Sequence, residues 1–352
     1  MITVLLASWN GAAYIREQVD SILGQQGLGD GETSSIRVMV SDDGSGDGTR
    51  EILEQYQERN PKQILLCHRD VKRKEKDRND GIPAAAGNFF WLMECAASGM
   101  FGGMEYNDQD KITADSDEYF MLSDQDDVWK PNKAALMLAE MKKLEQKFGN
   151  DHPILVHSDM EVVDANLKVI HPSFFKYQKC NPERTAFSEL LVENSVTGGA
   201  VMMNRALLEL VSKRPAACMM HDWWLALAAS CFGTISCVRE SLYLYRQHGN
   251  NTLGAKETGS VEDIKARMNR SAQVEENYRK MSAQAHAFGK MYEKRMSEEQ
   301  KAVLRAYLAL RYQSPMGRMK NILKNRFFKS SKLQTIAQCV TIPRPDGGNW
   351  PV

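Results

Sequence analysis

The sequence lacks the features that would place a chain in a membrane or in an oxidising compartment. No apolar run approaches the roughly 18 residues that cross a bilayer. The apolar start at Met1 carries no basic leader and soon reaches polar Asn10, so no secretion signal is predicted. The seven cysteines form no CxxC pair, which predicts reduced thiols and argues against a zinc site. Together these absences predict a cytoplasmic protein.

The net charge is zero, but the charges are unevenly distributed. The 352 residues carry 45 Lys and Arg against 45 Asp and Glu, whereas the segment from Val261 to the end has 18 basic and only 8 acidic residues. A basic segment favours an anionic partner. Three interpretations are equally open: peripheral contact with the inner face of the cell membrane, packing on the rest of the chain, and a homodimer. No nucleic-acid partner is expected.

Apolar runs that end in turn residues alternate with segments of helical spacing over the first ~160 residues. This alternation predicts an α/β fold in which a mostly parallel central sheet carries helices on both faces. The expected strands are residues 2–7, 36–40, 64–67, 119–122 and 154–157, and the expected helices are residues 11–25, 49–56, 88–97 and 131–148.

The remaining segments are more varied. The very polar residues 69–80 are expected to form a mobile loop, and residues 234–238 and 241–245 two short strands. Amphipathic helices are expected from about residue 260 onward. The predicted domains are a catalytic domain at 1–255, a basic helical extension at 256–335 and a flexible tail at 336–352.

Three carboxylates, Asp124, Asp126 and Asp127, directly follow the expected strand that ends at Leu122. Neighbouring carboxylates repel one another, and a divalent cation removes that repulsion. Their oxygens suit Mg²⁺ or Mn²⁺, which would bridge a diphosphate and neutralise its departing charge. The alternative is a solvated acidic turn that caps the next helix at Pro131.

Two more polar turns are expected at the same edge of the sheet, because ligands of α/β sheets bind beyond the carboxyl ends of the strands. Ser8 and Asn10 follow the first strand, and Asp42, Asp43 and Ser45 follow the second. A carboxylate there can accept hydrogen bonds from a pyrimidine base or a ribose. The alternative for the second turn is an Asx turn with a helix N-cap, since Asp and Gly form turns anyway.

Further candidates lie past residue 220. Asp222, which opens an apolar helix after His221, is predicted to be the general base for an acceptor hydroxyl, with desolvation beside Trp223 raising its pKa. The alternative is a helix N-cap. Arg246 is predicted to bind phosphate. His248 is predicted to bind metal or diphosphate, and a structural role for it is equally open.

Seven stretches, in this order, resemble the family 2 glycosyltransferases of the GT-A (Rossmann-like) fold, and within them bacterial rhamnosyltransferase-like enzymes. The resemblance covers roughly residues 1 to 255. The stretches are Leu6-Ala7-Ser8-Trp9-Asn10-Gly11, Val40-Ser41-Asp42-Asp43-Gly44-Ser45, Gly87-Asn88-Phe89, Leu122-Ser123-Asp124-Gln125-Asp126-Asp127-Val128-Trp129, Thr197-Gly198-Gly199, His221-Asp222-Trp223-Trp224 and Tyr245-Arg246-Gln247-His248-Gly249-Asn250-Asn251.

The resemblance implies roles for these residues. Asp124-Gln125-Asp126 would be the DxD motif, with Asp126 the direct metal ligand, and Asp222 would be the base of an inverting displacement. The donor side would comprise Ser8, Asn10, Asp42, Asp43, Ser45, Asn88, Asp124 and Arg246. The acceptor side would comprise Gly198, Gly199, His221 and Trp223.

The expected activity is transfer of a hexose or deoxyhexose, with rhamnose a candidate, from a dTDP- or UDP-linked donor. The acceptor would be a saccharide or lipid-linked hydroxyl in surface polysaccharide synthesis. A sugar nucleotidyltransferase is one alternative, but the turn at Ser8 lacks the glycine-rich basic loop of that class. A non-catalytic nucleotide-sugar-binding protein is the other.

Overall fold

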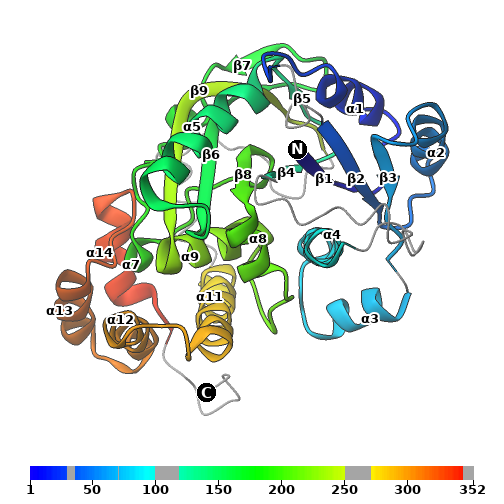
Figure 1. Ribbon diagram of the computed structural model, residues 1–352. Helices are drawn as coiled ribbons and strands as arrows, with labels where there is room; N and C mark the ends of the chain where they lie inside the picture. The colour runs from blue at the N-terminus through cyan, green and yellow to red at the C-terminus, as the bar shows by residue number, and fades with distance from the viewer. Residues whose placement is uncertain (30–35, 70, 100–118, 250–270, 344–352) are drawn as a thin grey trace.

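One sheet organises the α/β fold, and helices cover both of its faces (Figure 1). The computed structural model describes residues 1–29, 36–69, 71–99, 119–249 and 271–343. Within them, the strands join in the order β3-β2-β1-β4-β8-β6-β9-β5, with β7 paired to β6. Their bounds are β1 Ile2–Ser8, β2 Ile36–Asp42, β3 Ile64–Leu66, β4 Tyr119–Ser123, β5 Val128–Trp129, β6 Ile154–Val163, β7 Val169–His171, β8 Val201–Asn204 and β9 Thr234–Arg246.

The sheet is parallel in its N-terminal half and mixed beyond it. β1 pairs in parallel with β2 and β4, and β2 with β3. β8 then enters antiparallel between β4 and β6, and β6 pairs in parallel with β9. The α/β fold class is confirmed. The antiparallel pairs arise where a strand enters without a crossover helix, as β8 does after the short 3-10 turn η2 (Gly198–Ala200).

The side chains of each strand alternate between two apolar cores, one on each face of the sheet. On β1, Val4 and Leu6 join one core and Leu5 joins the other. β4 divides Met121 and Leu122 in the same way. Because both faces are covered, these strands are continuous apolar runs, and the carboxyl ends of β1, β2 and β4 meet at one edge.

The helices that cover the sheet begin and end close to the predicted positions. α1, α2 and α5 supply the core that contains Val4, while α4, α8 and α9 supply the core that contains Leu5. Their bounds, with those of α3 and two short helices, are α1 Ile15–Leu23, α2 Thr49–Arg59, α3 Val71–Asn79, α4 Ala84–Ser98, α5 Lys133–Phe148, α6 Phe174–Gln178, α7 Phe187–Leu190, α8 Arg205–Val211 and α9 His221–Phe232.

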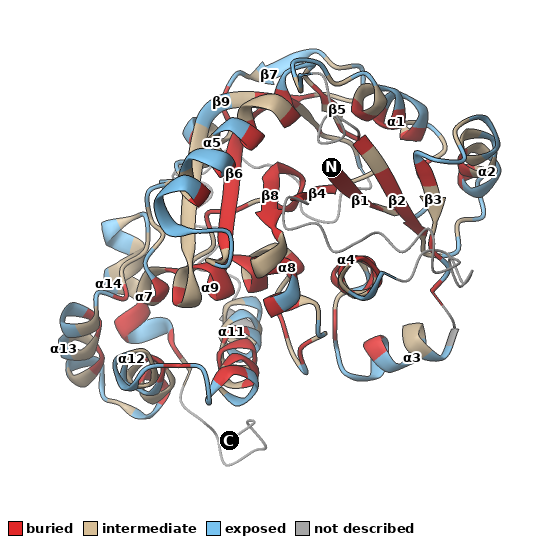
Figure 2. Cartoon of the chain, in the orientation of Figure 1, coloured by how far each residue is buried: buried red, intermediate tan, exposed pale blue. Residues whose placement is uncertain are grey.

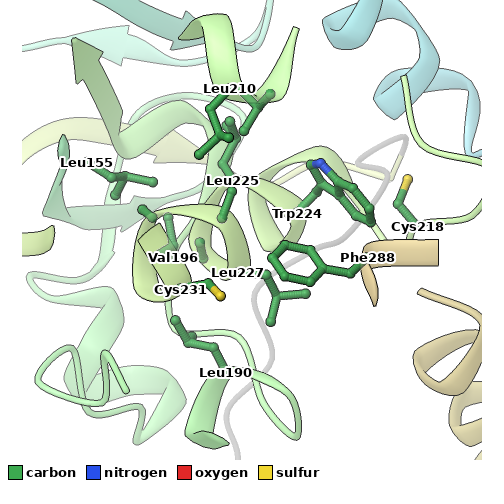
Figure 3. Packing of buried hydrophobic residues seen from close by; sticks show 14 of the residues in the cluster. Leu155, Leu190, Val196, Leu210, Cys218, Trp224, Leu225, Leu227, Cys231 and Phe288 are labelled. Atoms are coloured by element: carbon green, nitrogen blue, oxygen red, sulfur yellow. The ribbon is translucent and has the colours of Figure 1, made fainter. Parts of the chain in front are cut away.

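The C-terminal helices share a core with the first 255 residues. Phe288 packs against Trp224 of α9 with ring centroids 5.4 Å apart (Figure 3), and Leu304 and Phe327 join the same cluster. No helix among the described residues is long and apolar enough to cross a membrane. The bounds are α11 Ser271–Tyr292, α12 Glu298–Ala309, η3 Leu310–Tyr312, α13 Pro315–Asn325 and α14 Lys332–Thr341.

The predicted mobile loop at 69–80 is wrong, because most of it forms helix α3. This helix has no apolar face to reveal it, but Lys, Arg and Glu are good helix formers. Ion pairs then fix it in place. Arg73 pairs with Glu94 of α4 and lies 4.7 Å from the Trp91 ring, and Lys74 pairs with Asp43 at 3.0 Å.

Two other boundaries are corrected. The two short strands expected at 234–238 and 241–245 are one strand, β9, whose pairing with β6 shifts register between them. The charged pair Arg239-Glu240 sits at that shift and interrupts the apolar pattern. The expected flexible tail begins too early at 336, since α14 continues to Thr341; residues 344–352 lie outside the described residues.

Candidate active site

A set of hydrogen bonds joins the turns that follow β1 and β2. The Asp42 carboxylate accepts from the Ser8 hydroxyl at 2.9 Å and the Ser45 hydroxyl at 2.5 Å. The Asn10 N–H donates to the Ser45 hydroxyl at 2.7 Å, and its side-chain oxygen accepts from the Gly46 N–H at 2.9 Å. Asn10 has a φ of 49°, a left-handed conformation that Asn adopts more readily than most residues. The structure therefore brings these predicted donor-side residues together.

Asp42 and Asp43 have different surroundings. The Asp42 carboxylate also accepts from the Gly44 N–H at 3.1 Å, so Asp42 forms an Asx turn. The N-cap of α2 is Gly48, so neither of these two carboxylates caps that helix. Asp43 instead faces cations, with Lys74 Nζ at 3.0 Å and Arg69 Nη2 at 3.5 Å. Two cations thus face the mostly buried Asp43 carboxylate, while Asp42 holds the shape of the turn through its hydrogen bonds.

Gln125 joins the acidic run, residues 124–127, to the turn after β1. Its side-chain oxygen accepts from the Trp9 N–H at 2.7 Å, and its amide nitrogen donates to the Trp9 carbonyl at 2.8 Å. A Cβ at Gly11 would lie 2.3 Å from Gln125 Oε1, so a side chain at this position would have to displace the Gln125 amide from the Trp9 backbone. The Trp9 side chain is 60% exposed, which leaves a large aromatic face open beside the site.

The acidic run lies below the surface. Asp126 and Asp127 are buried and Asp124 is partly buried. Burial, followed by the charges of Asp126 and Asp222, raises the pKa of Asp124 to about 7. Burial and the two neighbouring carboxylates likewise raise the pKa of Asp127. The alternative of a solvated capping turn is wrong, since the N-cap position of α5 belongs to Asn132.

A buried lysine that the sequence analysis missed compensates part of this charge. Lys133, in the first turn of α5, is fully buried and donates to the Gly199 carbonyl at 2.6 Å. Its ammonium lies 3.8 Å from the Trp129 ring centroid and 4.2 Å from that of Tyr243. Burial lowers the pKa of Lys133, and the Asp127 and Asp124 carboxylates oppose that shift.

Arg246, the last residue of β9, donates hydrogen bonds to the acidic run. Its backbone N–H donates to Asp127 Oδ1 at 3.1 Å, and its Nε donates to the Asp126 carbonyl at 2.7 Å. The remaining guanidinium nitrogens contact the Ala165 carbonyl and the Glu17 carboxylate. Arg246, the predicted phosphate ligand, is therefore buried and hydrogen-bonded to protein groups.

His248 lies beside Asp126 in the acidic run. Its Nε2 is 2.8 Å from Asp126 Oδ2, and its ring stacks on Tyr14 with centroids 4.8 Å apart. The ring is thus held in contact with the acidic run by an aromatic neighbour. Asn250 and Asn251 of the same motif lie outside the described residues.

Asp222 lies in the first turn of α9 and approaches the same site from the other side. Its Oδ2 accepts from the Gly198 N–H at 3.2 Å, and its Oδ1 accepts from the Trp223 N–H at 2.6 Å. It is not the N-cap, which is Met220. Burial raises the pKa of Asp222 to about 7. Because its charge in turn raises the pKa of Asp124, the two carboxylates belong to one electrostatic environment.

His221 is a buried neighbour of this base. Its ring stacks on Phe89 with centroids 4.0 Å apart, and its Nε2 would lie 2.6 Å from a Cβ at Gly198. Burial lowers the pKa of His221 to about 3, so the ring is neutral at physiological pH. Its contact with Gly198 makes it a support of the glycine turn.

Asn88 and Trp223 are also anchored to the backbone. The buried Asn88 amide donates to the Ser41 carbonyl at 2.8 Å, just before the Asp42 turn. The Trp223 indole donates to the Leu190 carbonyl at 2.6 Å. Asn88 thus contacts the end of β2, and Trp223 contacts the end of α7.

The carboxylates fit a divalent cation that arrives with a phosphorylated ligand. Among the residues that the structure describes, no three Asp, Glu, His or Cys side chains form a ready-made metal cage. Asp124 and Asp126 nevertheless offer oxygen ligands in an environment that is rich in negative charge. Mg²⁺ typically binds through one or two carboxylates and takes its other ligands from substrate phosphates and water.

The polar turns lie beyond the carboxyl ends of β1, β2 and β4, which is where α/β enzymes bind their ligands. Sequence comparison agrees: residues 3–95 match the model of Glycosyl transferase family 2. An uncharacterized glycosyltransferase of Nostoc is 24% identical over 75% of this chain and 70% of its own length. The dTDP-rhamnosyl transferase RfbG of Shigella flexneri is 25% identical over 71% of this chain and 74% of its own length.

Solved structures show weaker likenesses. S. aureus TarS in complex with UDP-GlcNAc has a TM-score of 0.47 and 14% identity, over 92% of this chain and 89% of the other. A mannosyltransferase from Pyrobaculum calidifontis in complex with GDP-Man and Mn²⁺ has the same TM-score and identity, over 97% and 85%. Neither is close enough to transfer ligand chemistry to this chain.

Residues 3–95 thus match the family 2 glycosyltransferase model, and two glycosyltransferases are similar to most of the chain, whose fold is α/β. These matches support the predicted glycosyltransferase activity. They favour this activity over both a sugar nucleotidyltransferase and a non-catalytic binding protein.

Proposed function

We propose that this enzyme transfers a hexose or deoxyhexose from a nucleotide-diphosphate sugar to a hydroxyl of a saccharide or lipid-linked acceptor, with inversion at the anomeric carbon. The product would belong to a surface polysaccharide. We favour rhamnose from a dTDP donor, because the Shigella relative is named a dTDP-rhamnosyl transferase; a UDP-linked hexose is the alternative. The observation that carries the proposal is Asp222, which the Gly198 N–H holds in the environment of the acidic run.

The turns after β1 and β2 would hold the nucleotide. Ser8, Asn10, Asp42 and Ser45 form a hydrogen-bonded frame whose shape is set before the donor binds. Preformed frames reduce the entropy lost on binding. The exposed Trp9 ring, held beside this frame by Gln125, offers a face on which a base can stack.

Asp124 and Asp126 would hold Mg²⁺ or Mn²⁺, with His248 beside Asp126 as a further ligand or as an orienting partner. When bound, the cation would neutralise charge on the diphosphate leaving group. Arg246 keeps the acidic loop in place through its bonds to Asp126 and Asp127. This assignment replaces the predicted direct contact between Arg246 and phosphate.

Asp222 would act as the general base. A base is most useful when its pKa lies near the working pH, and burial raises the pKa of Asp222 to about 7. The acceptor hydroxyl would give its proton to Asp222 while its oxygen attacks the anomeric carbon. The bond from that carbon to the diphosphate oxygen breaks on the opposite side, which inverts the configuration. Gly198 and Gly199, which have no side chains, would let the acceptor come close to this carboxylate.

Transfer assays on two variants test the proposal. Nucleoside diphosphate release from dTDP-rhamnose and UDP-hexoses is measured with Mn²⁺, with and without oligosaccharide acceptors. Asp222→Asn should keep donor binding but slow transfer by about 10²- to 10⁴-fold. Asp126→Asn should lose the metal dependence of donor binding. Asp151→Asn, a change at an exposed turn, is the matched control.

Two results would overturn the proposal. Wild-type transfer rates in both variants would remove Asp222 and Asp126 from the reaction. A product with retained anomeric configuration, read from its NMR coupling constants, would exclude a single displacement.

A further inference from the structure

The two last helices carry apolar side chains on their outer faces. Met316 and Leu323 lie seven residues apart on α13, and Leu333, Ile336 and Val340 follow helical spacing on α14. All five are exposed, Met316 to 73% and Leu333 to 72%. Six of the eleven exposed large apolar side chains among the described residues fall between Tyr312 and Val340. This concentration is too strong for scattered surface exposure.

These outer faces are distinct from the faces that hold the helices to the protein. Arg318 and Ile322 of α13 and Gln338 and Cys339 of α14 are buried. Figure 2 shows both helices at the edge of the molecule, each with buried and exposed sides. A pocket with about 370 Å³ of space, partly open to solvent, is lined by Gln338 on the inner side of α14. The outer faces are therefore not needed for the fold.

The surrounding charge is of one sign. Residues 300–345 contain ten Lys and Arg and no Asp or Glu. Lys320, Lys324, Arg326 and Lys332 are exposed on or beside the two helices. A second copy of the chain would bring these cations against one another, which is unfavourable.

The exposed apolar and basic side chains of α13 and α14 indicate the kind of partner that this surface binds. Its apolar members on α13 and α14 are Met, Leu, Ile and Val, which suit acyl chains, whereas a nucleic acid would favour aromatic residues for base stacking. Basic residues beside aliphatic ones on an amphipathic helix are the combination that binds anionic membrane surfaces. We propose that the outer face of α13 and α14 docks on an anionic lipid bilayer. This inference stands independently of the proposed transfer reaction.

Vesicle sedimentation of the full chain tests it. Vesicles that contain phosphatidylglycerol should sediment the protein at low salt, and binding should fall steeply at high salt. Pure phosphatidylcholine vesicles should sediment little of it. Equal binding to both kinds of vesicle would overturn the proposal.

Two variants separate charge from apolar contact. The charge variant is Lys320→Glu/Lys324→Glu/Lys332→Glu, and the apolar variant is Leu323→Gln/Leu333→Gln. Each should reduce the partition coefficient about tenfold or more. Wild-type binding in either one would overturn the proposal.

A matched control carries Lys62→Glu/Lys142→Glu/Lys147→Glu, three exposed lysines far from α13 and α14 in the sequence, and should bind within about twofold of wild type. A control that loses as much binding as the charge variant would show an effect of net charge only, and would overturn the assigned face.

Thermal unfolding and donor turnover in solution should match wild type in all variants. If light scattering shows a dimer that the apolar variant splits, the face joins two copies and the lipid proposal is wrong.

Discussion

The Lys133 ammonium donates a hydrogen bond to the Gly199 carbonyl oxygen across 2.6 Å, and so joins the first turn of α5 to the glycine turn before β8. The same ammonium is the buried cation opposite Asp127 and Asp124. One side chain thereby links the donor-side acidic run to the turn whose Gly198 N–H holds Asp222.

Replacement of Lys133 by an apolar residue should therefore be costly although its side chain is fully buried. Lys133→Met should lower the free energy of unfolding by about 3 kcal/mol, because it leaves buried carboxylates without their cation. Lys130→Met is the control: it removes a partly exposed pair with Glu161 at 2.6 Å and should cost less than about 1 kcal/mol. Denaturant unfolding measures both. Equal costs would show that Lys133 contributes only packing.

Asp222 should destabilise the folded protein at neutral pH. Its pKa is raised to about 7 when folded and is about 3.9 when unfolded, so folding favours its protonated form. The stability it confers is present below about pH 4 and is lost as the pH rises through about 7. Asp222→Asn should therefore exceed wild type in stability at pH 8, by up to roughly 4 kcal/mol, and match it near pH 4. Thermal unfolding across this pH range measures the difference. Asp151→Asn should show no such trend, and a constant offset for Asp222→Asn would contradict the raised pKa.

The sequence predicts the strands correctly where helices cover both faces of the sheet. β1, β2 and β4 are uninterrupted apolar runs because helices cover both faces of the sheet. α3 escapes prediction because long-range ion pairs, such as Lys74 with Asp43, fix it instead of an apolar face. β9 is split in the prediction because Arg239 and Glu240 fall at its register shift.

The site, like the fold, could be predicted from the sequence only in part. Turn chemistry and carboxylate spacing locate Asp124, Asp126 and Asp222 in the sequence, and the structure brings them into one environment. Nothing in the sequence distinguishes Lys133 from the surface lysines of α5, since a lysine is rarely buried. Likewise, only the fold reveals that the Arg246 guanidinium is turned toward the carbonyl of Asp126.

Metal affinity should depend on pH through Asp124. Its pKa is raised to about 7, and a carboxylate must be ionised to bind a cation. Protons therefore compete with the metal below pH 7, and the dissociation constant for Mn²⁺ with nucleoside diphosphate should rise up to roughly tenfold between pH 7.5 and pH 6. Calorimetric titration measures it. Asp124→Asn should bind more weakly and lose this dependence, while a flat profile in wild type would contradict the assignment.

The close approach of Gln125 to Gly11 can be tested by a double-mutant cycle. A Cβ at Gly11 would lie 2.3 Å from Gln125 Oε1, so Gly11→Ala must push the amide away from the Trp9 backbone and should cost about 1–3 kcal/mol in unfolding free energy. In a Gln125→Ala background the Gln125 amide is absent, and the same Gly11→Ala change should cost less than about 0.5 kcal/mol in unfolding free energy.

Nucleotide affinity should fall in both single variants, because both release the Trp9 turn. Additive costs would show that Gly11 is needed for a reason other than Gln125. A donor affinity unaffected by Gln125→Ala would separate the turn from nucleotide binding.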